Sequence, residues 1–234
     1  IYQGFQSYLM NFKTLLSIAA VAAVTQVTGC TLVPHTAQLD VPTATAAKQA
    51  NGQVVKIVSV TDSRQFVYPY TQKDCKTPST DGAEMLNDTA TKNRSFSRRG
   101  GCQAGEWGQH AMVMVPEGQT VAGNVASAVE VGMRQSGFKF DPADPAALPV
   151  SVDVINFWVG RDLDGMGGRA WYSHDVNVTV GDQAYNLKQS QTDKYYWEMG
   201  AGKVVSYAEL TLQSIANEAA QKIVAPVAVA ASTN

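Results

Sequence analysis

The alternation of hydrophobic and polar positions predicts a strand at the start of the folded part of the chain. Residues 54–60 are dense in β-branched side chains and partly alternate with polar ones, and Thr61-Asp62-Ser63-Arg64 forms a polar exit. A similar apolar run at 110–115 predicts a second strand that ends at Pro116. We expect both strands to lie in the core sheet.

The next periodic segment is helical. Apolar residues recur with the spacing of one helix face, namely Val121, Val125, Ala128, Val129 and Met133. Thr120 is placed to cap the amino end of this helix, and Gly137 is placed to end it in the left-handed conformation.

Three strands then follow in close succession. Apolar and polar residues alternate along 150–158. Residues 169–180 form a second long strand-like segment, and residues 184–190 form a third. The glycines at 165–168 and the turn at 181–183 are short connections. Such spacing predicts antiparallel hairpins.

A last helix is predicted at the carboxyl end. Ser206-Tyr207-Ala208-Glu209 fits a capping box, and apolar residues follow on one face until Pro226. The element order predicts an α+β fold, an antiparallel sheet with two helices packed on one face. We assign residues 54–226 to this single domain and 227–234 to a tail.

The amino-terminal segment has the pattern of a secretory leader. Met10 begins a short positively charged stretch, and Leu15 to Val27 forms an apolar run of about 13 residues, whereas a spanning helix needs about 20. Residues 1–9 precede Met10 and are interpreted as an upstream extension. Residues 1–29 are therefore predicted to be this extension plus a lipoprotein signal peptide.

The leader ends in Val27-Thr28-Gly29-Cys30, which resembles the lipobox of bacterial lipoproteins. This resemblance implies cleavage before Cys30, lipidation of its thiol and amine, and anchoring to a membrane. The residue after the cysteine is Thr31 and not Asp, which in the enterobacterial sorting rule implies the periplasmic face of the outer membrane. Residues 30–53, rich in Thr, Ala and Gln, are predicted to be a flexible tether.

Two cysteines remain after Cys30. Cys75 and Cys102 lie in a polar segment, about 71–108, that has no sustained periodicity and is interpreted as an insertion. In an oxidising compartment the pair predicts a disulfide that pins this insertion. A metal site is the alternative, but it would need further ligands at close spacing.

Several of these motifs together resemble the YajG-like family of uncharacterised bacterial outer-membrane lipoproteins. They are the lipobox, an opening strand that leads to Asp62 and Arg64, a helix that ends in Gly137-Phe138, and a closing helix after the paired strands. The resemblance covers about residues 54–224 and implies no catalytic residue. The segment from Cys75 to Cys102 departs from the family pattern.

Composition and motifs argue against nucleic-acid binding and catalysis. The formal charge of −2 supplies no basic footprint for nucleic acid. His174 and Asp175 are neighbours, but adjacent strand residues point to opposite faces, so they do not form half of a catalytic triad. We expect a protein that is not an enzyme and has no cofactor and no metal.

Two clusters are candidates for a binding surface. Asp62 and Arg64 could clamp a polar ligand, with a structural ion pair as the alternative. Tyr195, Tyr196 and Trp197 could form an aromatic contact, with sheet packing as the alternative. The function we expect is a non-enzymatic binding or structural accessory with an envelope protein partner. Its alternatives are an auxiliary ligand-handling lipoprotein of an envelope transport system and an envelope hydrolase.

Overall fold

The computed structural model describes residues 35–43, 52–64, 89–97, 113–164, 167–196 and 201–224. Cys30, Cys75, Cys102 and Trp197 lie outside the described residues, and so do the predicted leader and tail. Within the described ranges, no helix is both long enough and apolar enough to cross a membrane.

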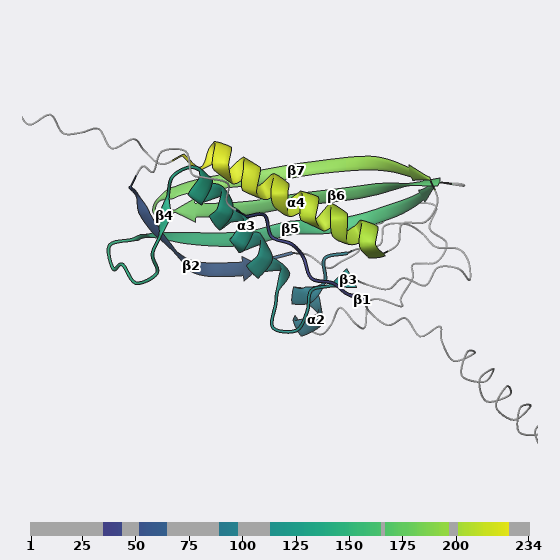
Figure 1. The fold of residues 1–234 in the computed structure, drawn as a ribbon, viewed down its shortest axis with the longest axis horizontal. Helices are drawn as coiled ribbons and strands as arrows, with labels where there is room; N and C mark the ends of the chain where they lie inside the picture. Colours follow the sequence, from purple (N-terminus) through teal and green to yellow (C-terminus); the bar gives the residue numbers. More distant parts are fainter. Residues whose placement is uncertain are drawn as a thin grey trace, which may run out of the picture. The chain divides into compact units, whose positions relative to one another are not determined.

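The described strands form two sheets, and Figure 1 shows the larger one with α3 and α4 drawn in front of it. The larger sheet has the order β4 (Lys139–Phe140), β2 (Val54–Asp62), β5 (Leu148–Asp164), β6 (Gly167–Val180) and β7 (Gln183–Tyr196). The smaller sheet pairs β1 (His35–Thr36) with β3 (Val113–Met114). The helices are α2 (Thr89–Arg94), α3 (Val121–Gln135) and α4 (Ala201–Lys222).

The larger sheet is mixed and not antiparallel throughout. The predicted hairpins are confirmed, because β5, β6 and β7 pair antiparallel in sequence order. The prediction is wrong for β2, which pairs parallel with both β4 and β5. A parallel pair needs a long crossover connection, and the chain between β2 and β5 contains α3. The fold class is therefore α+β with a mixed sheet.

The second predicted strand is also placed differently. Of residues 110–115, Val113 and Met114 form β3, which pairs with β1 in the smaller sheet. Both side chains are buried, so the apolar pattern correctly indicated an interior position. The pattern did not specify which strand would be the partner.

A β-bulge reverses the alternation along β5. Val150, Val152 and Val154 are buried, and the register with β6 then shifts between Val154 and Asn156. An extra residue moves every later side chain to the other face. Phe157 consequently lies in the core, although the simple alternation placed it opposite Val154.

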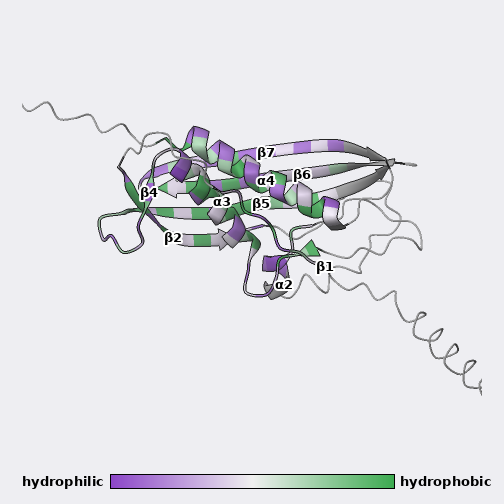
Figure 2. Ribbon diagram, in the orientation of Figure 1, coloured by the Kyte–Doolittle hydropathy of each residue, from purple (hydrophilic) through white to green (hydrophobic). Residues whose placement is uncertain are grey.

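The sheet has one buried row and one polar row at neighbouring positions. Val154, Val176 and Leu187 are in register on β5, β6 and β7, and all three are fully buried. One position along, a row of Thr61, Asp153, Asn177 and Asn186 crosses four strands. Figure 2 shows hydrophobic and hydrophilic residues alternating along these strands. This is the pattern of a sheet with one core face and one solvated face.

The helix α3 begins and ends as predicted. The Oγ1 of Thr120 accepts a hydrogen bond from the Gly123 amide at 3.0 Å, which satisfies one of the free amides at the helix start. Gly137 follows the helix with a φ of 96°, a conformation that glycine adopts without the penalty of a Cβ.

The helix α4 begins earlier than the predicted capping box. It starts at Ala201, so Ser206 lies inside the helix and its hydroxyl donates to the carbonyl of Gly202 at 3.1 Å. A serine within a helix commonly bonds the carbonyl four residues back. The apolar face was predicted correctly, since Leu212, Ile215 and Ala219 are all fully buried.

Part of the predicted tether belongs to the folded domain. His35 and Thr36 pair with β3, and the side chain of Leu39 is only 1% exposed within the core. Ala37 and Val41 pack against the same core. Apolar side chains at alternate positions, 37, 39 and 41, give this short segment an interior face that its overall composition concealed.

Part of the predicted insertion is likewise built into the core. Within residues 71–108, α2 leads to Ser95 and Phe96, which are both fully buried. Ser95 forms a bridge with Met114, and Ser97 forms one with Val159 of β5. Residues 95–97 therefore join the smaller sheet to β5 of the larger one.

Candidate functional site

The pair Asp62 and Arg64 is an interior ion pair. The Nε of Arg64 donates to Oδ1 of Asp62 and its Nη2 donates to Oδ2, each at 2.7 Å. The side chain of Arg64 has no exposed surface. The guanidinium also lies 4.7 Å from the ring centroid of Trp158, within the range of a cation–π contact.

All five N–H donors of this guanidinium are used. Besides the carboxylate, they reach the carbonyl of Ser95 at 2.8 Å, that of Phe157 at 3.3 Å and that of Lys92 at 3.1 Å. Arg64 thus connects three parts of the chain. These are the end of β2, the end of α2 with the segment that follows it, and β5. The clamp for a polar ligand predicted at Asp62 and Arg64 is corrected to its alternative, a structural ion pair, because burial leaves the guanidinium no surface for a ligand.

The aromatic candidate can be placed only in part. Tyr195 and Tyr196 are the last two residues of β7, where they pair with Gly168 and Gly167 of β6. Nearby, Tyr172 stacks on Tyr207 of α4 with ring centroids 5.1 Å apart, and the hydroxyl of Tyr207 donates to Asp193. An aromatic and polar contact therefore joins α4 to the same end of β7.

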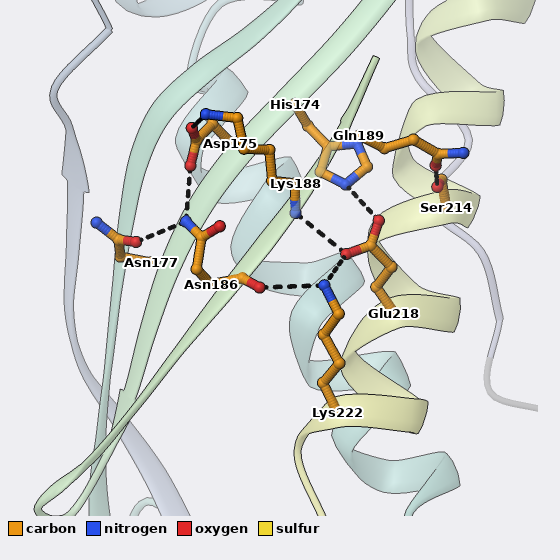
Figure 3. A network of polar contacts seen from close by, with 9 residues as sticks. All are labelled: His174, Asp175, Asn177, Asn186, Lys188, Gln189, Ser214, Glu218 and Lys222. Atoms are coloured by element: carbon orange, nitrogen blue, oxygen red, sulfur yellow. Dashed lines mark hydrogen bonds and ion pairs between the residues drawn. The ribbon is translucent and has the colours of Figure 1, made fainter. Parts of the chain in front are cut away.

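A larger polar network joins α4 to β6 and β7, and Figure 3 shows its members. Its centre is the carboxylate of Glu218 on α4. One oxygen lies 3.2 Å from Nε2 of His174, and the other accepts from the backbone amide of Lys188 at 3.1 Å and from Nζ of Lys222 at 2.9 Å. Glu218 thus connects three segments of the chain.

This network covers part of the edge of the larger sheet. Strand β7 is the last in the sheet order, so backbone groups that point away from β6 have no strand partner among the described residues. Glu218 accepts from the amide of Lys188, and Lys222 donates to the carbonyl of Asn186 at 3.2 Å. The two side chains therefore form hydrogen bonds with backbone groups of β7 that would otherwise be available to pair with another strand.

His174 is the buried member of the network. It is 2% exposed, and burial, the largest influence, lowers its pKa from the ordinary 6.5 although Glu218 acts in the opposite direction. An ionised carboxylate only accepts hydrogen bonds, so Nε2 carries the proton in the contact with Glu218. The imidazole is neutral near pH 7 and serves as a donor to the helix.

Asp175 lies on the opposite side of β6, as the sequence predicted. It accepts from Nζ of Lys188 at 2.5 Å and from Nδ2 of Asn186 at 2.7 Å, and this amide also donates to Asn177 at 2.9 Å. Burial would raise the pKa of Asp175, but the hydrogen bonds from Lys188 and Asn186 outweigh it and lower the pKa. His174 and Asp175 consequently have separate partners.

The hydroxyl and the imidazole in this network have different hydrogen-bond partners. The hydroxyl nearest in the network, that of Ser214, donates to Gln189 and not to His174. In the described part of the chain, no group of three or more His, Cys, Asp or Glu side chains is placed to hold a metal ion. Glu218 and Lys222 were not identified from the sequence, although their spacing of four residues on a helix is a recognisable signal of an ion pair.

The sequence matches no protein-family model and no curated protein. Among solved structures, it is similar to a DUF330 protein from Xanthomonas campestris, with a TM-score of 0.42 and 11% identity over 80% of this chain and 91% of that chain. It is also similar to the rare lipoprotein B from Shewanella oneidensis, with a TM-score of 0.27 and 17% identity over 42% of this chain and 80% of that chain.

A third similar structure is a neuraminyllactose-binding hemagglutinin homologue from Helicobacter pylori. Its TM-score is 0.35 at 6% identity, over 80% of this chain and 94% of that chain. Bacterial lipoproteins are thus among the similar structures. At these scores and identities, the likeness assigns neither a family nor a function to this chain.

Proposed function

We propose that the chain is a lipid-anchored envelope lipoprotein that faces the periplasm and acts as a non-enzymatic binding or structural accessory. The observation that carries this proposal is the apolar leader that ends in Val27-Thr28-Gly29-Cys30. Thr31 after the cysteine favours the outer membrane, and the resemblance to the YajG-like family points to the same class of protein.

The partner surface in this proposal is the polar face of the larger sheet. The proposal takes α3 and α4 to cover the other face together, which is supported by the core that both helices share with Val154, Val176 and Leu187. The polar row on the four strands is exposed at Thr61, Asn177 and Asn186. Hydrogen bonds already hold Asn186 to Asn177, so a partner would meet side chains that are partly pre-organised.

The proposal also includes Tyr195, Tyr196 and Trp197 as aromatic anchors, of which Tyr195 and Tyr196 are the last two residues of β7. Aromatic side chains often supply much of the binding energy where an interface exists. Tyr195 lies nine residues beyond Asn186 on β7, so a partner that contacts both features would have to extend about 30 Å along the strand.

The lipid anchor is tested by metabolic labelling with a palmitate analogue in intact bacteria. The wild-type protein should be labelled and recovered with the membranes, and the Cys30→Ser variant should be neither. Cys75→Ser is the matched control, because it removes a different thiol and should keep the label. Labelling that persists in Cys30→Ser would overturn the anchor.

The partner surface is tested with a photo-crosslinking residue in place of one exposed side chain. Asn177 lies on the polar face, whereas Gln213 is exposed on α4 and serves as the control. We expect a defined protein adduct from position 177 in intact cells and none from position 213. The same adduct from both positions, or from 213 alone, would contradict the proposed surface.

A further inference from the structure

We infer that the end of the domain that carries β1 and β3 is held next to the lipid bilayer. This inference rests on the proposed lipidation of Cys30. It concerns the orientation of the domain on the membrane, which the anchor by itself does not specify.

The chain is held to the domain at residues 35–43. His35 and Thr36 pair with Val113 and Met114, and the Ala37 amide donates to the Met114 carbonyl at 2.9 Å. Leu39 is buried in the core. These contacts place the point of attachment at β1.

Further contacts hold the same segment to α4 and to the residue that precedes the cap of α3. The backbone amide of Asp40 donates to Glu209 of α4 at 3.2 Å, and the side chain of Gln119, just before α3, donates to Gln38 at 2.9 Å. The segment is therefore attached at several points along its length. It does not act as a free spacer.

The length of chain between the anchor and β1 is short. Five Cα-to-Cα steps separate Cys30 from His35, and they span at most about 18 Å when fully extended. A tether over all of 30–53 would have had a contour length of about 80 Å, enough to let the domain turn freely. With the shorter connection, β1 must stay within about 18 Å of the lipid-modified cysteine.

The opposite end of the sheet is much farther from this point. Ser95 bridges to Met114 of β3, and Ser97 bridges to Val159 of β5, so β1 and β3 lie beside the Val159 position. Val150, near the other end of β5, pairs with Val180, which precedes the turn at Gly181 and Asp182. Nine residues of strand extend about 30 Å, so this turn is remote from the anchor.

The experiment measures energy transfer from the domain to the membrane. The full-length lipidated protein is reconstituted in phosphatidylethanolamine and phosphatidylglycerol vesicles that contain a headgroup-labelled acceptor lipid. A donor dye is attached through an unnatural amino acid at Glu117, three residues after β3, or at Asp182 in the remote turn; both positions are exposed. We expect transfer efficiency to be at least about twofold higher from position 117, given the 18 Å limit on β1.

A lengthened connection provides the matched control. Twenty Gly and Ser residues inserted between Val33 and Pro34 give a flexible spacer with a mean reach of about 25 Å and a much longer maximum. The insertion leaves every described contact in place. The ratio of transfer efficiencies between the two positions should fall toward one.

A second variant tests the contacts of the segment itself. Leu39→Asp should release residues 35–43 from the core and also lower the ratio, whereas Asp40→Asn should leave it unchanged. If Leu39→Asp prevents folding, the insertion variant still decides the question. A variant that folds and keeps the full ratio despite the insertion would overturn the inference.

The outcomes separate this inference from the proposed function. Vesicle flotation reports the anchor independently of the dye position. Equal transfer from positions 117 and 182 in protein that floats with the vesicles overturns the orientation and leaves the anchor intact. Wild-type protein that does not float, in a preparation processed by the bacterial lipidation pathway, overturns the anchor and the orientation together.

Discussion

Gly132 of α3 lies directly against the carbonyl oxygen of Ala216 in α4. A Cβ at position 132 would be 2.2 Å from that oxygen and 2.6 Å from the Cβ of Ala219. Close by, the hydroxyl of Ser136 donates to the carbonyl of Ala220 at 3.1 Å. The two helices therefore cross at near-backbone contact, which only small side chains at the crossing permit.

Gly132→Ala should destabilise the fold even though alanine is the better helix former. The added methyl group must push apart two backbones, and overpacking of this kind costs about 1–3 kcal/mol, more than the gain of about 1 kcal/mol in helix propensity. Thermal or denaturant unfolding measures the change. Gly202→Ala is the control, because nothing lies within 4 Å of that position, and it should be neutral or stabilising. A stabilised Gly132→Ala variant would contradict the close crossing.

Stability should decrease as the pH falls below about 6.5, because burial lowers the pKa of His174 in the folded state. The unfolded chain then binds the proton more readily than the folded chain does, so acid favours unfolding. Glu218, Asp175 and Lys222 are the charged groups whose fields act on this imidazole. Denaturant unfolding between about pH 8 and pH 5.5 measures the dependence, in a range where ordinary carboxylates remain mostly ionised.

His174→Gln supplies the comparison for this pH dependence. Glutamine retains a donor for Glu218 and does not titrate, so the variant should show a flatter profile over the same range. The other two histidines, His35 and His110, are present in both proteins and cancel in the difference. Identical slopes in the two proteins would rule out His174 as the source.

Glu218→Ala should lower the free energy of unfolding by about 1–3 kcal/mol, since it leaves the Lys188 amide and the His174 imidazole without their acceptor. Amide hydrogen exchange at Lys188 should speed up more than the change in global stability explains. Glu130→Ala removes a half-exposed pair with Arg134 on α3 and should cost no more than about 0.5 kcal/mol. Unchanged exchange at Lys188 would mean that Glu218 does not protect the strand edge.

Arg64→Lys should destabilise the fold by about 3 kcal/mol or more despite the conserved charge. Lysine cannot bond both oxygens of Asp62 in parallel and also reach the carbonyls of Ser95 and Phe157 from the same rigid group. Arg134→Lys, at a half-exposed helix pair, is the matched control and should change stability very little. Comparable small losses from both variants would show that the buried ion pair contributes little.

Two candidate helix caps should respond differently to the loss of a hydroxyl. Thr120→Ala removes the acceptor of the Gly123 amide and should cost about 1 kcal/mol. Ser206→Ala removes only a bond within α4 and should change stability by less than about 0.5 kcal/mol, because alanine also favours the helix. A larger loss from Ser206→Ala would indicate a helix that starts at the predicted capping box.

Local patterns in the sequence were sufficient for the elements whose causes are local. The spacing of Val121 to Met133, the cap at Thr120 and the stop at Gly137 placed α3 correctly, because these features depend on neighbours within one or two turns. The hairpins of β5, β6 and β7 were predicted for the same reason, since short connections leave antiparallel pairing as the available arrangement. The opposite orientations of His174 and Asp175 followed from strand geometry alone.

Only the tertiary structure decided the contacts between distant parts of the chain. The parallel pairing of β2, the burial of Leu39 and Phe96, and the choice of β1 as partner of β3 depend on groups tens of residues apart. The same holds for Glu218, whose two oxygens reach His174 and Lys188 across 44 and 30 residues. Periodicity indicates whether a residue prefers the interior. The free energy of burying a side chain, however, is nearly independent of which apolar surface covers it. The partner and register of each strand are therefore decided only when the whole core packs.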